Sequence, residues 1–141
     1  MQQFFDKIIV ATQEYSMHSI TDQVQRSLMN CCLRDGLCQL SIVHTSASLL
    51  IQENASSDVQ RDIVRFLDRI APMESGRYEH DLEGPDDMPA HLKTALTQTH
   101  ITLSVRNGEL VLGTWQGIFL LEHRARGSQR TVQVHLMGTT Q

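Results

Sequence analysis

The sequence predicts a single α+β domain over residues 1–141, with about seven strands and three helices. Some stretches carry apolar residues at helical spacing, whereas others alternate apolar and polar residues as half-buried strands do. Helical patterns come mostly early and strand patterns mostly late, an order typical of α+β domains. A chain of 141 residues can bury one hydrophobic core, and no linker or repeat divides it.

The N-terminal part of the sequence predicts, in order, a strand, a helix and two further strands. Residues 3–11 are apolar and rich in β-branched side chains, as in a strand. Apolar residues then recur at helical spacing over 20–32, and Gly36 stands where this helix should end. Residues 40–44 alternate and residues 48–52 form a short apolar run, so we expect a strand in each.

The middle of the chain predicts two more helices. Apolar residues within 56–72 share one stripe, opened by serines and an aspartate and closed by a proline. A third helix should begin at Met88 or Pro89, since proline in a first helical turn wastes no hydrogen bond. Its spacing predicts that Met88, Leu92 and Leu96 face inward.

The last third predicts the remaining strands. Residues 101–105 alternate strictly, and Asn107–Gly108 is typical of a two-residue hairpin turn, because both positions need a positive φ. The return strand should run from Glu109. Further strands are expected over 117–124 and 130–136.

Charge and hydropathy exclude two classes of partner. The net charge is −4 and the isoelectric point is near 5.9, whereas a nucleic-acid surface needs clustered positive charge. Arg124, Arg126 and Arg130 form a basic cluster, but it is small. No apolar run approaches the roughly 20 residues of a membrane span, and the first residues lack the pattern of a signal peptide. We therefore expect no nucleic-acid partner and no membrane.

The cysteines indicate a reducing compartment. Cys31, Cys32 and Cys38 are odd in number, two of them are adjacent, and they lack the CxxC spacing of a metal site. We therefore expect structural cysteines and a cytoplasmic protein.

Four histidines fall at the ends of predicted elements, where functional side chains usually lie: His44, His80, His91 and His123. Three neutral imidazoles with one open position form a usual zinc site, and imidazole also binds other first-row metals. Their spacing matches no known metal motif, so each keeps a structural alternative as a packed, exposed or ion-paired side chain.

The segment 78–93, YEHDLEGPDDMPAHLK, holds two of these histidines among five carboxylates. The carboxylates could orient the His80 ring or favour magnesium instead of zinc. The predicted helix start offers free backbone N–H groups, and Lys93 lies beside them, so a phosphate could bind there. Covalent catalysis through Ser46, Ser48 or a cysteine is possible, but the sequence shows no positioned base for it.

Three segments closely resemble the YjbQ-like family, also called secondary thiamine-phosphate synthases: HTSASLLIQEN (44–54), YEHDLEGPDDMPAHLK (78–93) and LGTWQGIFLLEHR (112–124). The resemblance covers nearly the whole chain, with a motif in each third. It implies the family's own α+β fold and a homotrimer with sites near subunit boundaries. It also implies weak formation of thiamine phosphate from a pyrimidine pyrophosphate and a thiazole phosphate.

The family's motifs fall on His44, Thr45, Ser46, Glu53, Asn54, Tyr78, His80, His91, Lys93, Gly113, Thr114, Trp115, Gln116 and Glu122, with His123 in the bacterial form of the pattern. The resemblance implies catalytic roles for His44, His80 and His91, and a divalent metal, zinc or magnesium, on these three with His123. We expect phosphate or cofactor binding at Ser46, Lys93, Thr114 and Arg124. Trp115 could stack on a pyrimidine or pack in a core.

The implied reaction expels pyrophosphate, which calls for a divalent ion and cationic side chains at the leaving group. The main enzymes for this reaction are (β/α)₈ barrels of roughly 200 residues or more, which a chain of 141 residues cannot form. Two other functions remain open. One is a metal-dependent hydrolase or transferase acting on another phosphorylated metabolite, and the other is a non-catalytic trimeric metal- or ligand-binding protein.

Overall fold

A computed structural model describes residues 1–140 of the chain. In chain order the elements are β1 (Gln2–Ala11), β2 (Ser16–Ser19), α1 (Thr21–Cys31), β3 (Leu33–Ile42), β4 (Ala47–Glu53), α2 (Ser57–Ile70), α3 (Asp87–Leu96), β5 (His100–Arg106), β6 (Glu109–Leu110), β7 (Gln116–Glu122) and β8 (Gln129–Thr140). The predicted α+β class is confirmed. The added strand is β2, whose four largely polar residues give no strand pattern.

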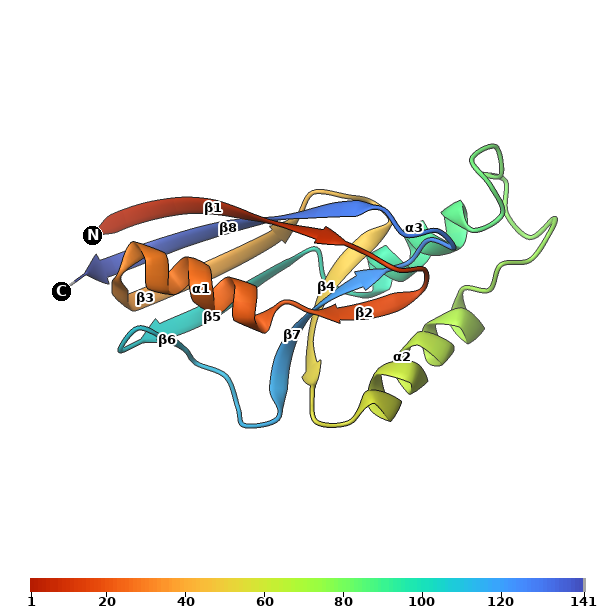
Figure 1. Ribbon diagram of the computed structural model, residues 1–141. Helices are drawn as coiled ribbons and strands as arrows, with labels where there is room; N and C mark the ends of the chain where they lie inside the picture. Colours follow the sequence, from red (N-terminus) through yellow and green to blue (C-terminus); the bar gives the residue numbers. More distant parts are fainter. Residues whose placement is uncertain (141) are drawn as a thin grey trace.

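The strands form two antiparallel sheets (Figure 1). The larger sheet has the order β1-β8-β3-β5-β6, and the smaller has the order β2-β7-β4. The main hydrophobic core gathers buried side chains from both sheets and from α1, including Leu28, Leu40, Leu49 and Ile118. Strand alternation supplies this core: Ile101, Leu103 and Val105 on β5 are buried and their neighbours are exposed.

The outer face of the larger sheet is exposed and partly apolar. Phe5 is 75% exposed and stacks on His135 of the paired strand, with ring centroids 4.3 Å apart. Ile9 and Leu37 lie on exposed positions of β1 and β3. Within residues 1–140, α1 and the smaller sheet pack on the opposite face.

The first helix ends earlier than expected. It stops at Cys31, Cys32 adopts a left-handed φ of 54°, and the Cys32 N–H donates to Met29 O. Gly36 is not the helix stop and lies inside β3. A Cβ there would lie 2.0 Å from Met137 O of β8, so the glycine permits close approach of two strands.

The hairpin prediction is confirmed. Asn107 and Gly108 have φ angles of 53° and 80°, as a type I′ turn requires, and they join β5 to β6. The return strand is short, ending at Leu110, and an exposed loop leads on to β7.

The two later helices pack less apolar surface than their patterns predicted. In α2 only Leu67 is buried, in a small second core with Phe119 and Leu121, while Phe66 and Ile70 are 53% and 45% exposed. In α3 the predicted inward face is wrong. Leu96 is 59% exposed, and the buried positions are Asp87, Pro89, Ala90, Lys93 and Thr94.

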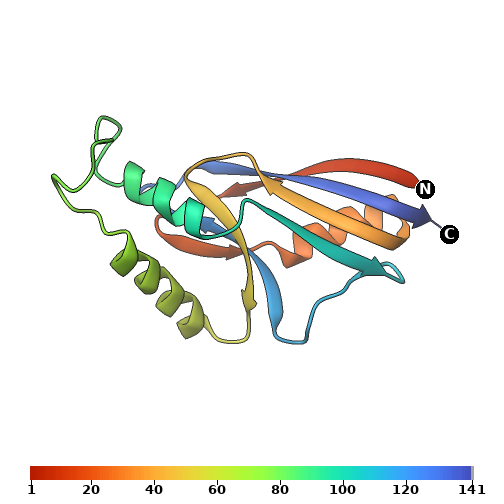
Figure 2. The same ribbon diagram turned by 180° about the vertical axis from the view of Figure 1, so that it is seen from behind.

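The helix α3 therefore turns a largely polar face inward, next to β4 (Figure 2). Such a face is stable only if its polar groups are paired.

No helix of the described residues 1–140 is long and apolar enough to cross a membrane. Cys31, Cys32 and Cys38 are free thiols.

Candidate functional site

Three side chains meet at the start of α3. Asp87 and His91 are four residues apart, so they lie on one face of the helix. Asp87 Oδ2 is 2.7 Å from His80 Nε2 and 3.0 Å from His91 Nε2. One ligand atom from each of the three lies within 4.8 Å of the others, and we call this set the His80–Asp87–His91 triad.

A tight turn brings His80 back onto the helix. Gly84 has a φ of 105°, a conformation that side chains other than glycine rarely adopt. A Cβ on Gly84 would also approach Asp86 Oδ1 to 3.0 Å. The glycine therefore lets the acidic loop fold over the first turn of α3.

Both ring nitrogens of His91 face hydrogen-bond acceptors. His91 Nδ1 lies 2.8 Å from Thr45 O, and a carbonyl oxygen only accepts, so Nδ1 carries the proton. In the neutral ring Nε2 then bears a lone pair, which faces the Asp87 carboxylate at 3.0 Å. Two acceptors at that distance repel unless a proton or a metal ion lies between them.

The donor set of the triad suits a transition metal. Two imidazole nitrogens and one carboxylate oxygen are common ligands of zinc and other first-row metals. Magnesium prefers oxygen ligands alone. Of the two metals expected from the sequence, zinc therefore fits these residues better.

Arg124 connects the triad to the loop between β7 and β8. Its Nη1 lies 2.9 Å from Asp87 Oδ1, and its Nε donates to Asp86 Oδ2 at 2.8 Å. Its Nη2 donates to Glu83 O at 3.0 Å, and the Ala125 N–H donates to Asp86 Oδ2 at 2.9 Å. These contacts hold the acidic loop against the β7–β8 loop.

The same contacts keep two buried carboxyls ionised. Burial by itself would raise the pKa of Asp87, but the hydrogen bond from His80 and the charges of His91 and Arg124 hold that pKa below its ordinary value. Burial likewise opposes a low pKa at Asp86, but the hydrogen bond from Arg124, backbone N–H groups and the charge of Arg124 together hold that pKa below its ordinary value. Pairing with Asp86 raises the pKa of Arg124.

A cavity of about 580 Å³, a size typical of small-molecule sites, opens at Asp86 and Arg124, which adjoin the triad without belonging to it. Its lining includes three guanidinium groups, from Arg124, Arg126 and Arg130, together with Ser46 and the carboxylates of Glu83 and Asp86. Gly127 completes one wall, where a Cβ would lie 2.0 Å from Thr12 O and displace the backbone. Clustered arginines and a hydroxyl are suited to an anion such as phosphate.

A larger cavity, of about 660 Å³, lies between the end of α1 and the β5–β6 turn. Its lining is mostly apolar, with Arg34 as its charged residue and no imidazole or carboxylate. The smaller cavity is the better candidate because its polar groups converge.

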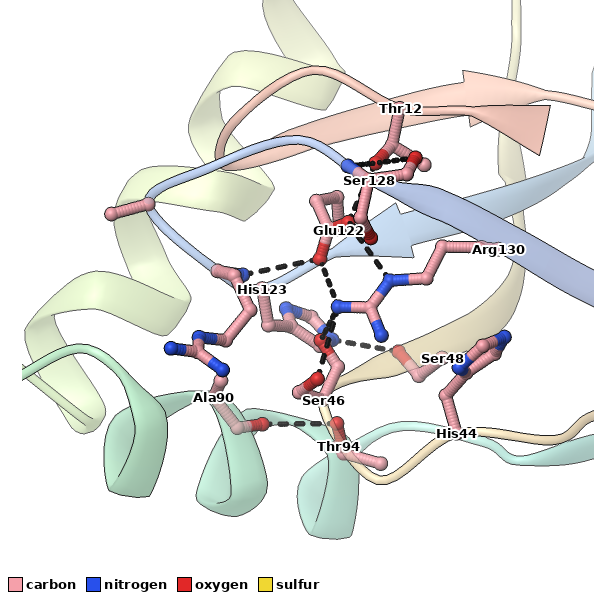
Figure 3. Close-up of polar contacts among 12 residues, drawn as sticks. Thr12, His44, Ser46, Ser48, Ala90, Thr94, Glu122, His123, Ser128 and Arg130 are labelled. Atoms are coloured by element: carbon pink, nitrogen blue, oxygen red, sulfur yellow. Dashed lines mark hydrogen bonds and ion pairs between the residues drawn. The ribbon is translucent and has the colours of Figure 1, made fainter. Parts of the chain in front are cut away.

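Arg130, which lines the smaller cavity, forms a buried ion pair with Glu122 (Figure 3). Glu122 is 1% exposed, and Arg130 Nε donates to its Oε1 at 2.9 Å. Arg130 Nη2 donates to Ser46 Oγ at 2.9 Å. Burial would raise the pKa of Glu122, but hydrogen bonds from Arg130 and Thr12 keep it below its ordinary value.

Several known proteins are similar to this chain in sequence. A family profile described as "UPF0047 protein YjbQ-like" matches residues 6–139. A UPF0047 protein of Synechocystis is 47% identical over 131 residues, covering 93% of this chain and 89% of the relative. This chain belongs to the YjbQ-like family. UPF0047 protein YjbQ of Escherichia coli O157:H7 is 39% identical over 132 residues, covering 93% of this chain and 95% of that relative.

Solved structures of the YjbQ-like family have the same fold. A YbjQ-like protein of unknown function from Sulfolobus solfataricus matches with a TM-score of 0.89 and 28% identity, over 98% of this chain and 99% of that one. A YjbQ/UPF0047 family protein from Clostridium acetobutylicum matches with a TM-score of 0.86 and 33% identity, over 94% and 99% of the two chains. The predicted family and fold are confirmed, and the trimer stays a prediction.

The family motif residue His44 does not join the triad. β3 ends at Ile42, and the His44 ring turns toward β8, where its Nε2 accepts from the Thr131 N–H at 2.9 Å. Burial and the nearby charge of Arg130 lower the pKa of His44. The predicted place of His44 beside His80 and His91 is wrong, because β3 ends at Ile42 and the ring does not continue the inward row of that strand.

His123 is also separate from the triad. It is 3% exposed, and its Nε2 is 2.8 Å from Ser48 Oγ. Burial and the charge of Lys93 lower its pKa to about 4, so the ring is neutral at physiological pH. The expected role as a metal ligand does not fit this position, because the side chain, one residue after the end of β7, is buried against Ser48.

Lys93 is not placed to hold phosphate. It is 3% exposed, pairs with Asp68 of α2, and lies over the Tyr15 ring at 4.9 Å from the centroid. The prediction was wrong because positions 90 and 93 are three residues apart on the helix, so Lys93 shares the buried face with Ala90.

Thr114 and Trp115 lie in the loop before β7, at the opposite end of that strand from Arg124 (Figure 1). Both are exposed, Trp115 at 64%, so neither reaches the cavity of its own chain.

Of the four residues expected to bind phosphate, Ser46 and Arg124 line the cavity. Sequence reasoning named Asp87 only among the loop carboxylates and did not group it with the histidines, although its spacing of four from His91 predicts one helix face. It named Arg130 only in a small basic cluster and gave it no place in the site.

Proposed function

We propose that this YjbQ-like protein is a metal-dependent enzyme that binds a phosphorylated small molecule in the arginine-lined cavity and acts on it beside the triad. The observation that carries the proposal is the cluster of His80, Asp87 and His91, with ligand atoms within 4.8 Å of one another, near a cavity lined by three guanidinium groups. Thiamine-phosphate formation from a pyrimidine pyrophosphate is the reaction to assay first, since a leaving pyrophosphate needs both features.

The residues divide into two groups by role. His80, Asp87 and His91 would hold the divalent ion, and a bound ion supplies Lewis-acid chemistry to an oxygen of the substrate. Arg126 and Ser46 would bind the phosphoryl oxygens. Among residues 1–140, Arg126 makes no ion pair, so its donors are available to a ligand.

Metal content tests the first half of the proposal. Untagged protein purified without chelators should carry about one zinc or similar ion per chain, measured by elemental mass spectrometry. His91→Ala should lose most of it, and His100→Ala, at an exposed site on β5, should keep it. A metal-free wild type, or equal metal in both variants, would contradict the metal site.

Turnover tests the second half. With metal present, wild type should release pyrophosphate from the pyrimidine substrate in the presence of the thiazole phosphate. Arg126→Ala should raise the KM for the phosphorylated substrate with less effect on kcat, because it removes a binding contact. Hydrolysis of another phosphorylated metabolite would instead support the hydrolase. Tight binding of phosphate without any turnover would support the non-catalytic alternative.

We also propose that the chain forms a homotrimer through apolar surface left exposed in the single chain. Phe5, Ile9 and Val43 are more than half exposed, and Leu37 is 42% exposed. Exposed apolar patches commonly mark protein–protein contacts.

A further inference from the structure

Glu122 is buried and bonds to several segments that build the site (Figure 3). Its Oε1 accepts from Thr12 Oγ1 at 2.6 Å and from Arg130 Nε at 2.9 Å. Its Oε2 accepts from Arg130 Nη2 at 2.5 Å and from the Arg124 N–H at 3.2 Å. One carboxylate thus ties the end of β1 to β8 and to the β7–β8 loop.

One path leads from Glu122 to His91. Arg130 Nη2 also donates to Ser46 O at 3.2 Å and to Ser46 Oγ at 2.9 Å. Thr45 precedes Ser46, and the Thr45 carbonyl accepts from His91 Nδ1 at 2.8 Å. The guanidinium therefore fixes the backbone that sets the tautomer and orientation of the His91 ring.

A second path leads from Glu122 to Asp87. The Arg124 N–H is held by Glu122, while Arg124 Nη1 lies 2.9 Å from Asp87 Oδ1. Asp87 Oδ1 is thereby engaged, which leaves Oδ2 directed at the two imidazoles. Both triad residues on α3 depend on the same buried carboxylate.

We propose that Glu122 is a positioning residue for the triad and acts through Arg130 on His91 and through Arg124 on Asp87. This inference rests on the proposed metal site. Glu122 makes no contact with a triad atom itself. Partners that orient metal ligands commonly change metal affinity about 10–100-fold when they are removed.

The test compares zinc binding by wild type and Glu122→Gln, using competitive titration against a chelating dye. We expect the zinc Kd to rise about 10–100-fold, although every triad residue remains. Leu28→Ala is the control, because Leu28 is fully buried in the main core, on α1 and outside the site. The control should lose stability and keep the wild-type zinc Kd. Unchanged affinity in Glu122→Gln, or equal weakening in the control, would overturn the inference.

Glu122→Gln leaves the buried Arg130 guanidinium unpaired and could prevent folding. Arg130→Lys retains a cation for Glu122, but a single ammonium group cannot reproduce the guanidinium contacts to Glu122 and Ser46. It should weaken zinc binding in the same direction. Wild-type affinity in a folded Arg130→Lys variant would count against the inference.

A readout without metal separates this inference from the proposed function. In metal-free protein, ¹H–¹⁵N spectra report how fast the proton on His91 Nδ1 exchanges with solvent, and a hydrogen bond to the Thr45 carbonyl should slow that exchange. Wild type should show a protected Nδ1 proton, and Glu122→Gln a rapidly exchanging one. If wild type binds no zinc, the proposed metal site fails, and the proton-exchange comparison still decides the positioning role. Equal exchange rates in both proteins would refute it.

Discussion

At the scale of single residues, the candidate site depends on the buried carboxylate of Asp87, which has three side-chain partners. Asp87 is 2% exposed and contacts His80, His91 and Arg124. A buried carboxylate is tolerated only when such partners compensate for lost hydration. Its neighbours therefore keep it charged, which a metal ligand requires.

Asp87→Asn should abolish tight metal binding while preserving the shape of the side chain. The amide is a weaker ligand and carries no charge, so we expect at least about a tenfold rise in the zinc Kd. Asp81→Asn, in the same loop but exposed, is the matched control and should behave as wild type. Equal affinities in the two variants would exclude Asp87 from the site.

His123 should make stability depend on pH between about 6.5 and 4. Its folded pKa is about 4 against an ordinary 6.5, so the unfolded chain binds more protons in this window. The stabilisation is therefore complete above about pH 6.5 and is lost as pH falls toward 4, by on the order of 3 kcal/mol.

Urea unfolding at several pH values measures this loss, with His123→Phe as the non-titrating comparison. The variant should lose less stability than wild type between about pH 6.5 and 4.5. Ser48 keeps a partner there, because the Thr97 hydroxyl donates to it at 2.6 Å. Parallel pH profiles for the two proteins would show that His123 is not the titrating group.

At the scale of elements, α3 combines packing with function. Its inward face carries Asp87 and Lys93 around the small Ala90, and its outward face carries Leu96. The apolar pattern alone suggested the reverse. The polar face of α3 can turn inward because its two charged residues form ion pairs, Asp87 with Arg124 and Lys93 with Asp68.

The orientation of α3 can be tested with two substitutions. Ala90 is fully buried, so Ala90→Leu should overpack the interface and cost about 1–3 kcal/mol of unfolding free energy. Leu96→Ala should change that free energy by less than about 0.5 kcal/mol, since Leu96 is 59% exposed. Chemical unfolding measures both. A larger loss from Leu96→Ala would mean that the helix faces the other way.

At the scale of the whole molecule, the exposed apolar face of the larger sheet leads to a prediction about the oligomeric state. If the proposed trimer uses this face, light scattering should give about three times the chain mass of 16.0 kDa. Phe5→Glu should reduce the mass by placing a charge within the contact. Phe66→Glu makes the same change at an exposed position of α2, outside the larger sheet, and should keep the wild-type mass. A wild-type mass near that of one chain would refute the trimer.

The sequence by itself determined the α+β class, the Asn107–Gly108 hairpin and the family, because periodicity, turn chemistry and motifs are local properties of the chain. It also indicated His80 and His91 as neighbours in one motif segment. Only the tertiary structure decided that Asp87 joins them and that His44 and His123 do not. It likewise decided that Lys93 is buried and that Arg130 faces Ser46. Side-chain partners across separate strands depend on register and on where each strand ends, and no local pattern specifies either.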